Sequence, residues 1–204
     1  MKKVIVIAIL SFVAAGSIMA QKLELFVHSG YTFGDKFPFS DGRGKIYDGH
    51  TYGGLISVEI SDDYAIELAY SRQDSRVLAI SDYLGLDVDE KVSVNYILAG
   101  GNRLMKVNES VTLFSGLKLG AVIIASKKEA FDNVTKFAVG LNAGAKYFMT
   151  EKLGLRVQAN LNFPVTDVGG SLWWSPGGGL DAGVSSYTPV LQFGFTGGLV
   201  FKIK

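Results

Sequence analysis

The sequence predicts an all-β fold, a transmembrane β-barrel of eight antiparallel strands in up-and-down order. After residue 20, apolar and polar residues alternate with the period of two that a β-strand imposes. The apolar runs in this part of the chain are too short for a membrane-spanning helix, although 48% of all residues are hydrophobic. Long and short connections also alternate, as they do in barrels that cross a membrane.

The first 20 residues predict a secretory signal peptide. Two lysines precede an apolar run over residues 4–13, and small residues follow as far as Ala20. This run is shorter than the roughly 20 residues that a membrane-spanning helix needs. We therefore expect a signal peptide over 1–20 and one β-barrel domain over 21–204.

The charge and the cysteine content exclude two classes of protein. Apart from the two lysines of the predicted signal peptide, 18 of the 20 basic residues remain against 19 acidic ones, a formal charge of −1. A chain so close to neutrality gives no reason to expect a nucleic-acid partner. The sequence contains no cysteine, so we expect neither a disulfide framework nor a lipid-modified cysteine.

Eight segments alternate between apolar and polar residues. In the clearest of them, Leu155 and Val157 fall on one face of the predicted strand, and Arg156 and Gln158 fall on the other. The predicted strands are residues 22–33, 51–60, 64–71, 91–101, 111–123, 135–148, 153–163 and 190–204.

The links between these segments fall into two groups. Tight links are expected near 61–63, 105–109 and 149–152. The longer connections, which are largely polar, cover residues 34–50, 72–90, 125–133 and 164–186. In an up-and-down barrel, this alternation places all the tight links and both termini at one end and the longer connections at the other.

The polar face of the strands is expected to line the lumen. It is rich in Gly, Ser and Asn, and eight strands enclose a space that side chains can fill. Unpaired charges there would be costly, so we expect ion pairs. In the fourth segment this assignment places Val92, Val94 and Tyr96 outside, opposite Lys91. The candidate lumen charges are Glu24, Glu59, Glu67, Lys91, Lys118, Lys146 and Arg156.

Taken together with the closing segment FGFTGGLVFKIK, these features resemble the small eight-stranded outer-membrane proteins of the OmpA and OmpX type. The resemblance covers residues 21–204. It implies a location in the bacterial outer membrane, with both termini on the periplasmic side and with lipid and lipopolysaccharide around the barrel. It also implies that the barrel assembly machinery recognises the closing strand. Nothing in the sequence points to a cofactor.

Two classes of function stay open for such a barrel. The first, which we favour, is a structural or surface-interaction protein whose outer loops contact surface polysaccharide, host molecules or neighbouring proteins. The second is a small porin, which needs a continuous water path past the lumen charges. Conductance across a bilayer distinguishes these two. A soluble periplasmic barrel would instead stay monomeric without detergent.

Little in the sequence points to catalysis or metal binding. His28 is expected to make a hydrogen bond in the lumen. His50, Asp48 and Ser40 are the residue types that barrel-embedded lipid A-modifying enzymes use, but their spacing matches no motif, so we predict no catalytic residues. The acidic run at 87–90 lacks the spacing of a calcium-binding loop, so we predict no metal site.

The last long connection contains adjacent Trp173 and Trp174 among glycines. Exposed Trp pairs are uncommon unless they make a contact. We expect the two rings to fold over the barrel mouth or to enter the lipopolysaccharide interface, where amphipathic rings are stable. Recognition of an external partner is the alternative.

Overall fold

The computed structural model describes residues 22–39, 42–81, 86–126, 133–165 and 191–203. Within these ranges the chain forms ten β-strands that belong to one sheet. No helix in the described part of the chain is long and apolar enough to cross a membrane. The predicted signal peptide over 1–20 and the pair Trp173 and Trp174 lie outside the described residues.

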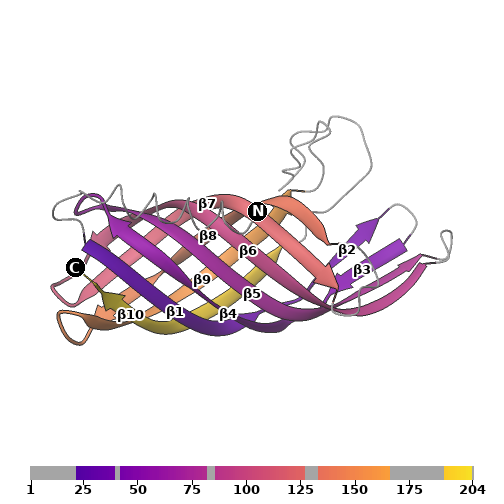
Figure 1. The fold of residues 1–204 in the computed structure, drawn as a ribbon, viewed down its shortest axis with the longest axis horizontal. Coiled ribbons are helices and arrows are strands. Elements are labelled where there is room, and N and C mark those ends of the chain that lie inside the picture. Colours follow the sequence, from indigo (N-terminus) through magenta and orange to yellow (C-terminus); the bar gives the residue numbers. More distant parts are fainter. Residues whose placement is uncertain (1–21, 40–41, 82–85, 127–132, 166–190, 204) are drawn as a thin grey trace, which may run out of the picture.

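Eight of the ten strands close into a barrel (Figure 1). Around the ring the order is β1, β4, β5, β6, β7, β8, β9 and β10, and β10 pairs again with β1. Every pairing is antiparallel, so the predicted eight-stranded up-and-down barrel is confirmed. The barrel strands are β1 (Lys22–Thr32), β4 (Gly49–Glu59), β5 (Tyr64–Ser81), β6 (Leu86–Lys106), β7 (Val111–Ser126), β8 (Val134–Phe148), β9 (Leu153–Val165) and β10 (Gln192–Lys202).

The first two long connections contain more regular structure than the sequence predicts. Within 34–50, β2 (Asp35–Phe39) and β3 (Gly42–Ile46) form a hairpin that pairs with the far end of β5. Within 72–90, β5 and β6 continue to pair beyond the rest of the barrel, as far as Ser81 and Leu86. The expectation that both segments are loops was wrong, because strands occupy much of each. The β-ladder continues there because the hairpin provides another strand against β5. We call β2, β3 and these extensions of β5 and β6 the outer sheet (Figure 1).

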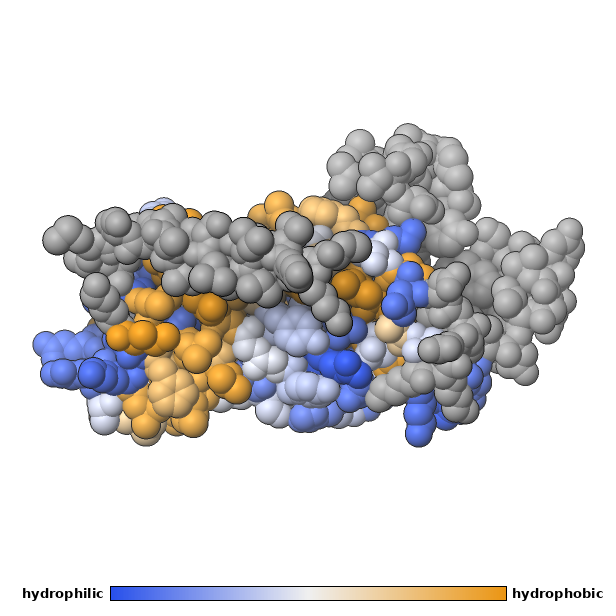
Figure 2. Space-filling model, in the orientation of Figure 1, coloured by the Kyte–Doolittle hydropathy of each residue, from blue (hydrophilic) through white to orange (hydrophobic). Residues whose placement is uncertain are grey.

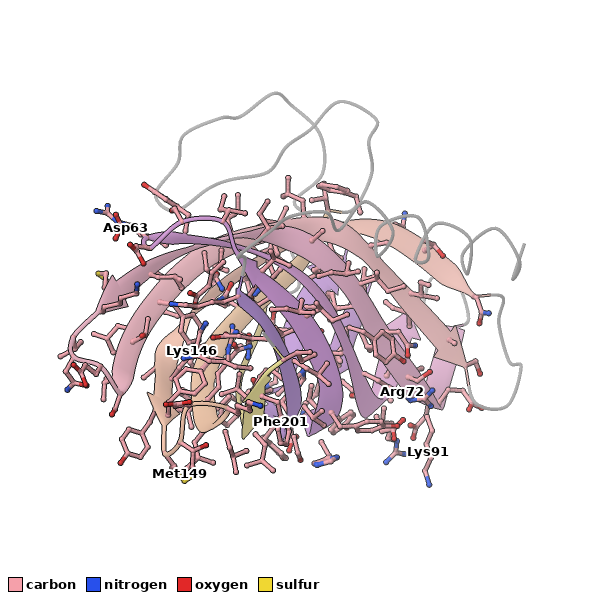
Figure 3. All side chains as sticks on the ribbon, turned by 60° about the vertical axis from the view of Figure 1, so that its left-hand side comes forward. Asp63, Arg72, Lys91, Lys146, Met149 and Phe201 are labelled. Carbon is pink, nitrogen blue, oxygen red and sulfur yellow. The ribbon has the colours of Figure 1, made fainter. Side chains whose placement is uncertain are left out.

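Three short turns lie at the opposite end of the barrel, as predicted. Asn108 Oδ1 accepts hydrogen bonds from the backbone N–H groups of Ser110 at 2.9 Å and Val111 at 2.8 Å, and thereby closes the turn between β6 and β7. In the neighbouring turn, Asp62 pairs with Lys106, and this hydrogen bond holds the pKa of the Asp62 carboxyl below its usual value. Figure 3 shows this end at Asp63 and Met149.

The outside of the barrel carries an apolar band. Leu68 is 50% exposed and Val157 is 59% exposed, and many other large apolar side chains on the outward face are exposed to a similar degree. Figure 2 shows hydrophobic residues gathered over the barrel on one face of the molecule. An apolar surface of this extent is stable where lipid covers it. The outward assignment of the apolar face is therefore confirmed for most strands, and β6 is the exception.

Candidate functional site

The lumen contains a buried ion-pair network in which one carboxylate binds two cations. Glu67 on β5 accepts hydrogen bonds from Arg156 on β9, at 2.7 Å from Nη1 and 3.2 Å from Nη2. The ammonium nitrogen of Lys118 on β7 lies 3.0 Å from the second Glu67 oxygen. Because β5 and β9 are separated by three strands on either side of the ring, this network joins opposite walls of the barrel.

Aromatic rings and an amide fix the Arg156 side chain, which is fully buried. Its guanidinium carbon lies 4.1 Å from the ring centroid of Phe114 and 5.1 Å from that of Phe26. Its Nε donates to Gln158 Oε1 at 2.9 Å. A planar guanidinium can stack on rings while its edge binds a carboxylate, and a lysine ammonium cannot do both. Arg156 therefore fills the centre of the lumen in one fixed orientation.

A second cluster of charges lies toward the end with the short turns. Lys146 on β8 donates to Glu24 on β1 at 2.5 Å, and its ammonium lies 3.9 Å from Glu59 on β4. Lys22 lies 3.7 Å from the same Glu59. Lys146 and Glu24 are both buried, and Figure 3 shows Lys146 inside the barrel. Six of the predicted lumen charges thus lie within these two clusters, so the charge of the lumen is close to balanced. They are Glu24, Glu59, Glu67, Lys118, Lys146 and Arg156.

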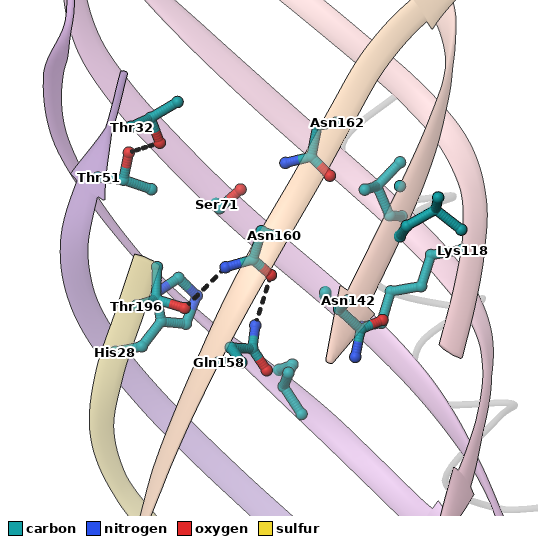
Figure 4. A pocket seen from close by; sticks show the side chains of 15 residues that line it. His28, Thr32, Thr51, Ser71, Lys118, Asn142, Gln158, Asn160, Asn162 and Thr196 are labelled. Atoms are coloured by element: carbon teal, nitrogen blue, oxygen red, sulfur yellow. Dashed lines mark hydrogen bonds between the residues drawn. The ribbon is translucent and has the colours of Figure 1, made fainter. Parts of the chain in front are cut away.

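Amides and hydroxyls occupy the lumen beyond the charges, around a cavity of about 40 Å³ (Figure 4). Asn160 accepts from Gln158 at 2.7 Å and donates to Thr196 at 3.0 Å. His28 also lines the cavity, and its Nδ1 has no hydrogen-bond partner among the described residues. The volume has room for about three waters at roughly 10–15 Å³ each. The cavity is therefore too small for a solute.

Apolar side chains close the lumen toward the outer sheet, and they correct one of the sequence predictions. Val92 and Val94 on β6 point inward and are at most 1% exposed, whereas Lys91 points out of the barrel (Figure 3). The prediction of Lys91 as a lumen charge and of the β6 valines as outward residues was therefore wrong. The β6 side chains pack against Val122 and Ala138. Alternation shows that a strand has two faces but does not say which face lies inside.

A hydrogen-bonded chain crosses the lumen beside this apolar cluster. Tyr96 donates to Gln192 Oε1 at 2.6 Å, and Gln192 donates to Gln73 Oε1 at 3.0 Å. All three side chains are buried. Gln192 falls on the polar face of its predicted strand, whereas Gln73 falls in the predicted connection 72–90, and nothing in their spacing shows that they meet. The three side chains join β5, β6 and β10.

Replacing Tyr96 by Phe should lower the free energy of unfolding by about 1–3 kcal/mol. The substitution leaves the buried Gln192 oxygen without a donor and adds no volume. The measurement is urea unfolding of the full chain in lipid vesicles. Tyr70→Phe is the matched control, because the exposed Tyr70 hydroxyl donates to Asn95 where water can replace it. Equal losses in the two variants would contradict this account of the chain.

The residues of the catalytic hypothesis do not meet as a triad in the described structure. His50 Nε2 lies 2.8 Å from Ser29 Oγ on the outer wall, and Asp48 accepts a hydrogen bond from Tyr31. Ser40 lies outside the described residues. Among the described residues, no group of three acidic, His or Cys side chains could hold a metal ion.

Solved structures with the same fold support the class of protein. The crystal structure of Neisserial surface protein A matches 90% of this chain and 99% of its own, with a TM-score of 0.60 and 13% sequence identity. The N-terminal β-barrel domain of Pseudomonas aeruginosa OprF matches over 89% and 97%, with a TM-score of 0.51 and 11% identity. No protein-family model and no curated protein matches the sequence.

The closed ring of strands, the exposed apolar band and these structural similarities define one class. The chain has the fold of the small eight-stranded, OmpA-like β-barrels of the bacterial outer membrane. This fold places the barrel in a lipid environment. At identities of 11–13% the similarity establishes the fold, and the function has to be argued from the residues.

Proposed function

We propose that this protein is a closed outer-membrane barrel that presents the outer sheet for contact with surface molecules, and that residues 1–20 direct its export. The observation that carries the proposal is the contrast between the filled lumen and the outer sheet. Side chains fill the lumen, while β5 and β6 extend beyond the barrel and pair with the β2–β3 hairpin. A barrel that only conducted solutes would need an open lumen, and it would not need the outer sheet.

The closed lumen argues against the small-porin alternative. At one level Arg156 and Glu67 are fully buried between opposite walls, and at the next level Val92 and Val94 are buried beside Tyr96. The cavity of about 40 Å³ lies between the two levels. A porin of eight strands would have to keep a water path past both the ion pair and the apolar cluster, and the lumen of an eight-stranded barrel has little space for one.

The outer sheet has features suited to binding. Among the described strands β2 pairs only with β3, and an edge left unpaired by them is the kind of backbone to which a partner strand can be added. The base of the sheet is stiffened by the Arg76–Asp89 ion pair and by Lys45, whose ammonium lies 4.1 Å from the Tyr47 ring centroid. A stiff sheet loses little conformational entropy when it binds.

Rings on the outer wall support contact with lipopolysaccharide at the same end of the barrel. Phe193 and Phe195 pack edge to face at 4.9 Å, and Phe33 stacks on Phe193 at 6.0 Å. All three are between 41% and 52% exposed. Aromatic rings are stable at the boundary between hydrocarbon and head groups, so this cluster is suited to the outer-leaflet interface.

The proposal is tested by replacing residues 35–46 with Asn-Gly. Asp35 and Ile46 are paired neighbours, so a two-residue turn can join the flanking strands. Cells displaying the full chain should adhere to surfaces coated with lipopolysaccharide or with extracellular-matrix protein. The variant should adhere about tenfold less, the equivalent of about 1.4 kcal/mol.

The control replaces the turn residues 108–110 with Asn-Gly at the other end of the barrel, where the Val107 N–H donates to the Val111 carbonyl and so keeps the register of β6 and β7. Both variants should keep the heat-dependent gel shift of a folded barrel. Unchanged adhesion after loss of the hairpin, or no adhesion by the full chain to either surface, would contradict the proposal.

A further inference from the structure

An arginine that has no partner among the described residues lies on the outer wall near the end with the short turns. Arg103 is exposed on β6, close to the end of that strand at Lys106. It makes no ion pair or hydrogen bond within the described ranges of the chain. A cation on the lipid-facing wall is costly unless it reaches the interface and finds an anion there.

A row of small side chains begins beside this arginine and crosses three strands. Ser115 on β7 is the register partner of Arg103, Ala143 on β8 pairs with Ser115, and Ala159 on β9 pairs with Ala143. Ser115, Ala143 and Ala159 form the floor of an open groove of about 540 Å³ on the outer wall. Larger apolar side chains border the groove, namely Leu117, Leu141, Leu161 and Phe193.

The groove runs obliquely away from the end with the short turns. Arg103 lies three positions from the end of β6, whereas Ala159 lies six positions from the start of β9 at Leu153. Directly paired residues of neighbouring strands are about 4.5–5.5 Å apart. The row therefore starts at the level of the head groups nearest the turns and rises into the hydrocarbon.

We propose that the groove binds one acyl chain of a glycerophospholipid from the periplasmic leaflet. The lipid phosphate pairs with Arg103, and the Ser115 hydroxyl donates to an ester carbonyl of the glycerol. In glycerophospholipids phosphate and ester oxygens are near neighbours, as are these two side chains. The acyl chain then lies over Ala143 and Ala159. Lipopolysaccharide cannot place a phosphate on Arg103, because its phosphates are in the opposite leaflet, toward the end of the groove that Phe193 borders.

The test is native mass spectrometry of the full chain, purified in mild detergent, with added phosphatidylglycerol. The wild type should retain one lipid. Arg103→Gln should weaken binding about tenfold, as expected when a charged hydrogen bond is lost. Ala143→Phe should abolish retention because the ring fills the groove. Ala99→Phe is the matched control, since Ala99 is also exposed on the outer wall but does not line the groove.

The folded state of each variant is checked by its heat-dependent gel shift. If the wild type retains no lipid in one-to-one ratio, the inference is wrong. It is equally wrong if Arg103→Gln and Ala143→Phe retain lipid as Ala99→Phe does, or if lipid A competes with phosphatidylglycerol for the groove on equal terms. None of these outcomes bears on the outer sheet, so the inference can fail independently of the proposed surface interaction.

Discussion

Replacing Glu67 by Ala should lower the free energy of unfolding by about 3–5 kcal/mol. Glu67 is fully buried and is the carboxylate that both Arg156 and Lys118 contact. Its loss leaves two buried cations without that anion, and removing one member of a buried pair costs far more than removing an exposed one. The measurement is urea unfolding of the full chain in lipid vesicles.

Two further variants show whether the charge or the volume of Glu67 matters. Glu151→Ala removes an exposed carboxylate in a turn and should change stability by less than about 1 kcal/mol. Combining Glu67→Leu with Lys118→Met and Arg156→Met should recover much of the loss, because apolar groups of similar size can replace a buried ion network. A Glu67→Ala effect no larger than that of Glu151→Ala would show that the network does not stabilise the barrel.

Leu119→Arg should lower stability by about 2–4 kcal/mol in lipid vesicles. Leu119 is 45% exposed on the outward face in the middle of β7, within the apolar band. Val107→Arg is the control. Val107 is 60% exposed in the turn before β7, and there an arginine should cost only about 0–1 kcal/mol. Similar costs at both positions would mean that lipid does not cover the apolar band.

The strands could be predicted because alternation persists along most of each one. In β9, Leu155 and Val157 point outward while Arg156 and Gln158 point inward, as the pattern indicates. The β2–β3 hairpin could not be predicted, since DKFPF and GRGKI contain no clear alternation. Its pairing depends on the protruding end of β5, which is distant in sequence. The ends of β5 and β6 within residues 72–90 were missed because they too depend on pairing with a segment distant in sequence.

The candidate lumen residues were predictable as members of a face, but their partners were not. Glu67 meets Arg156 across the barrel because the tilt and register of the strands bring them to one level, and neither quantity can be read from periodicity. Lys91 shows the opposite failure. Its strand has apolar residues on the inner face near the barrel mouth, so the rule that polar residues face the lumen assigns it to the wrong side.

Single-channel recording of the full chain in planar bilayers tests the central claim most directly, namely that the lumen is closed and the function lies outside it. Insertion is verified first by the heat-dependent gel shift. We expect a silent bilayer, because the ion-pair network and the apolar cluster block the lumen at two levels. Steady discrete openings that disappear when Lys118 or Arg156 is replaced would contradict the account and identify the protein as a small pore.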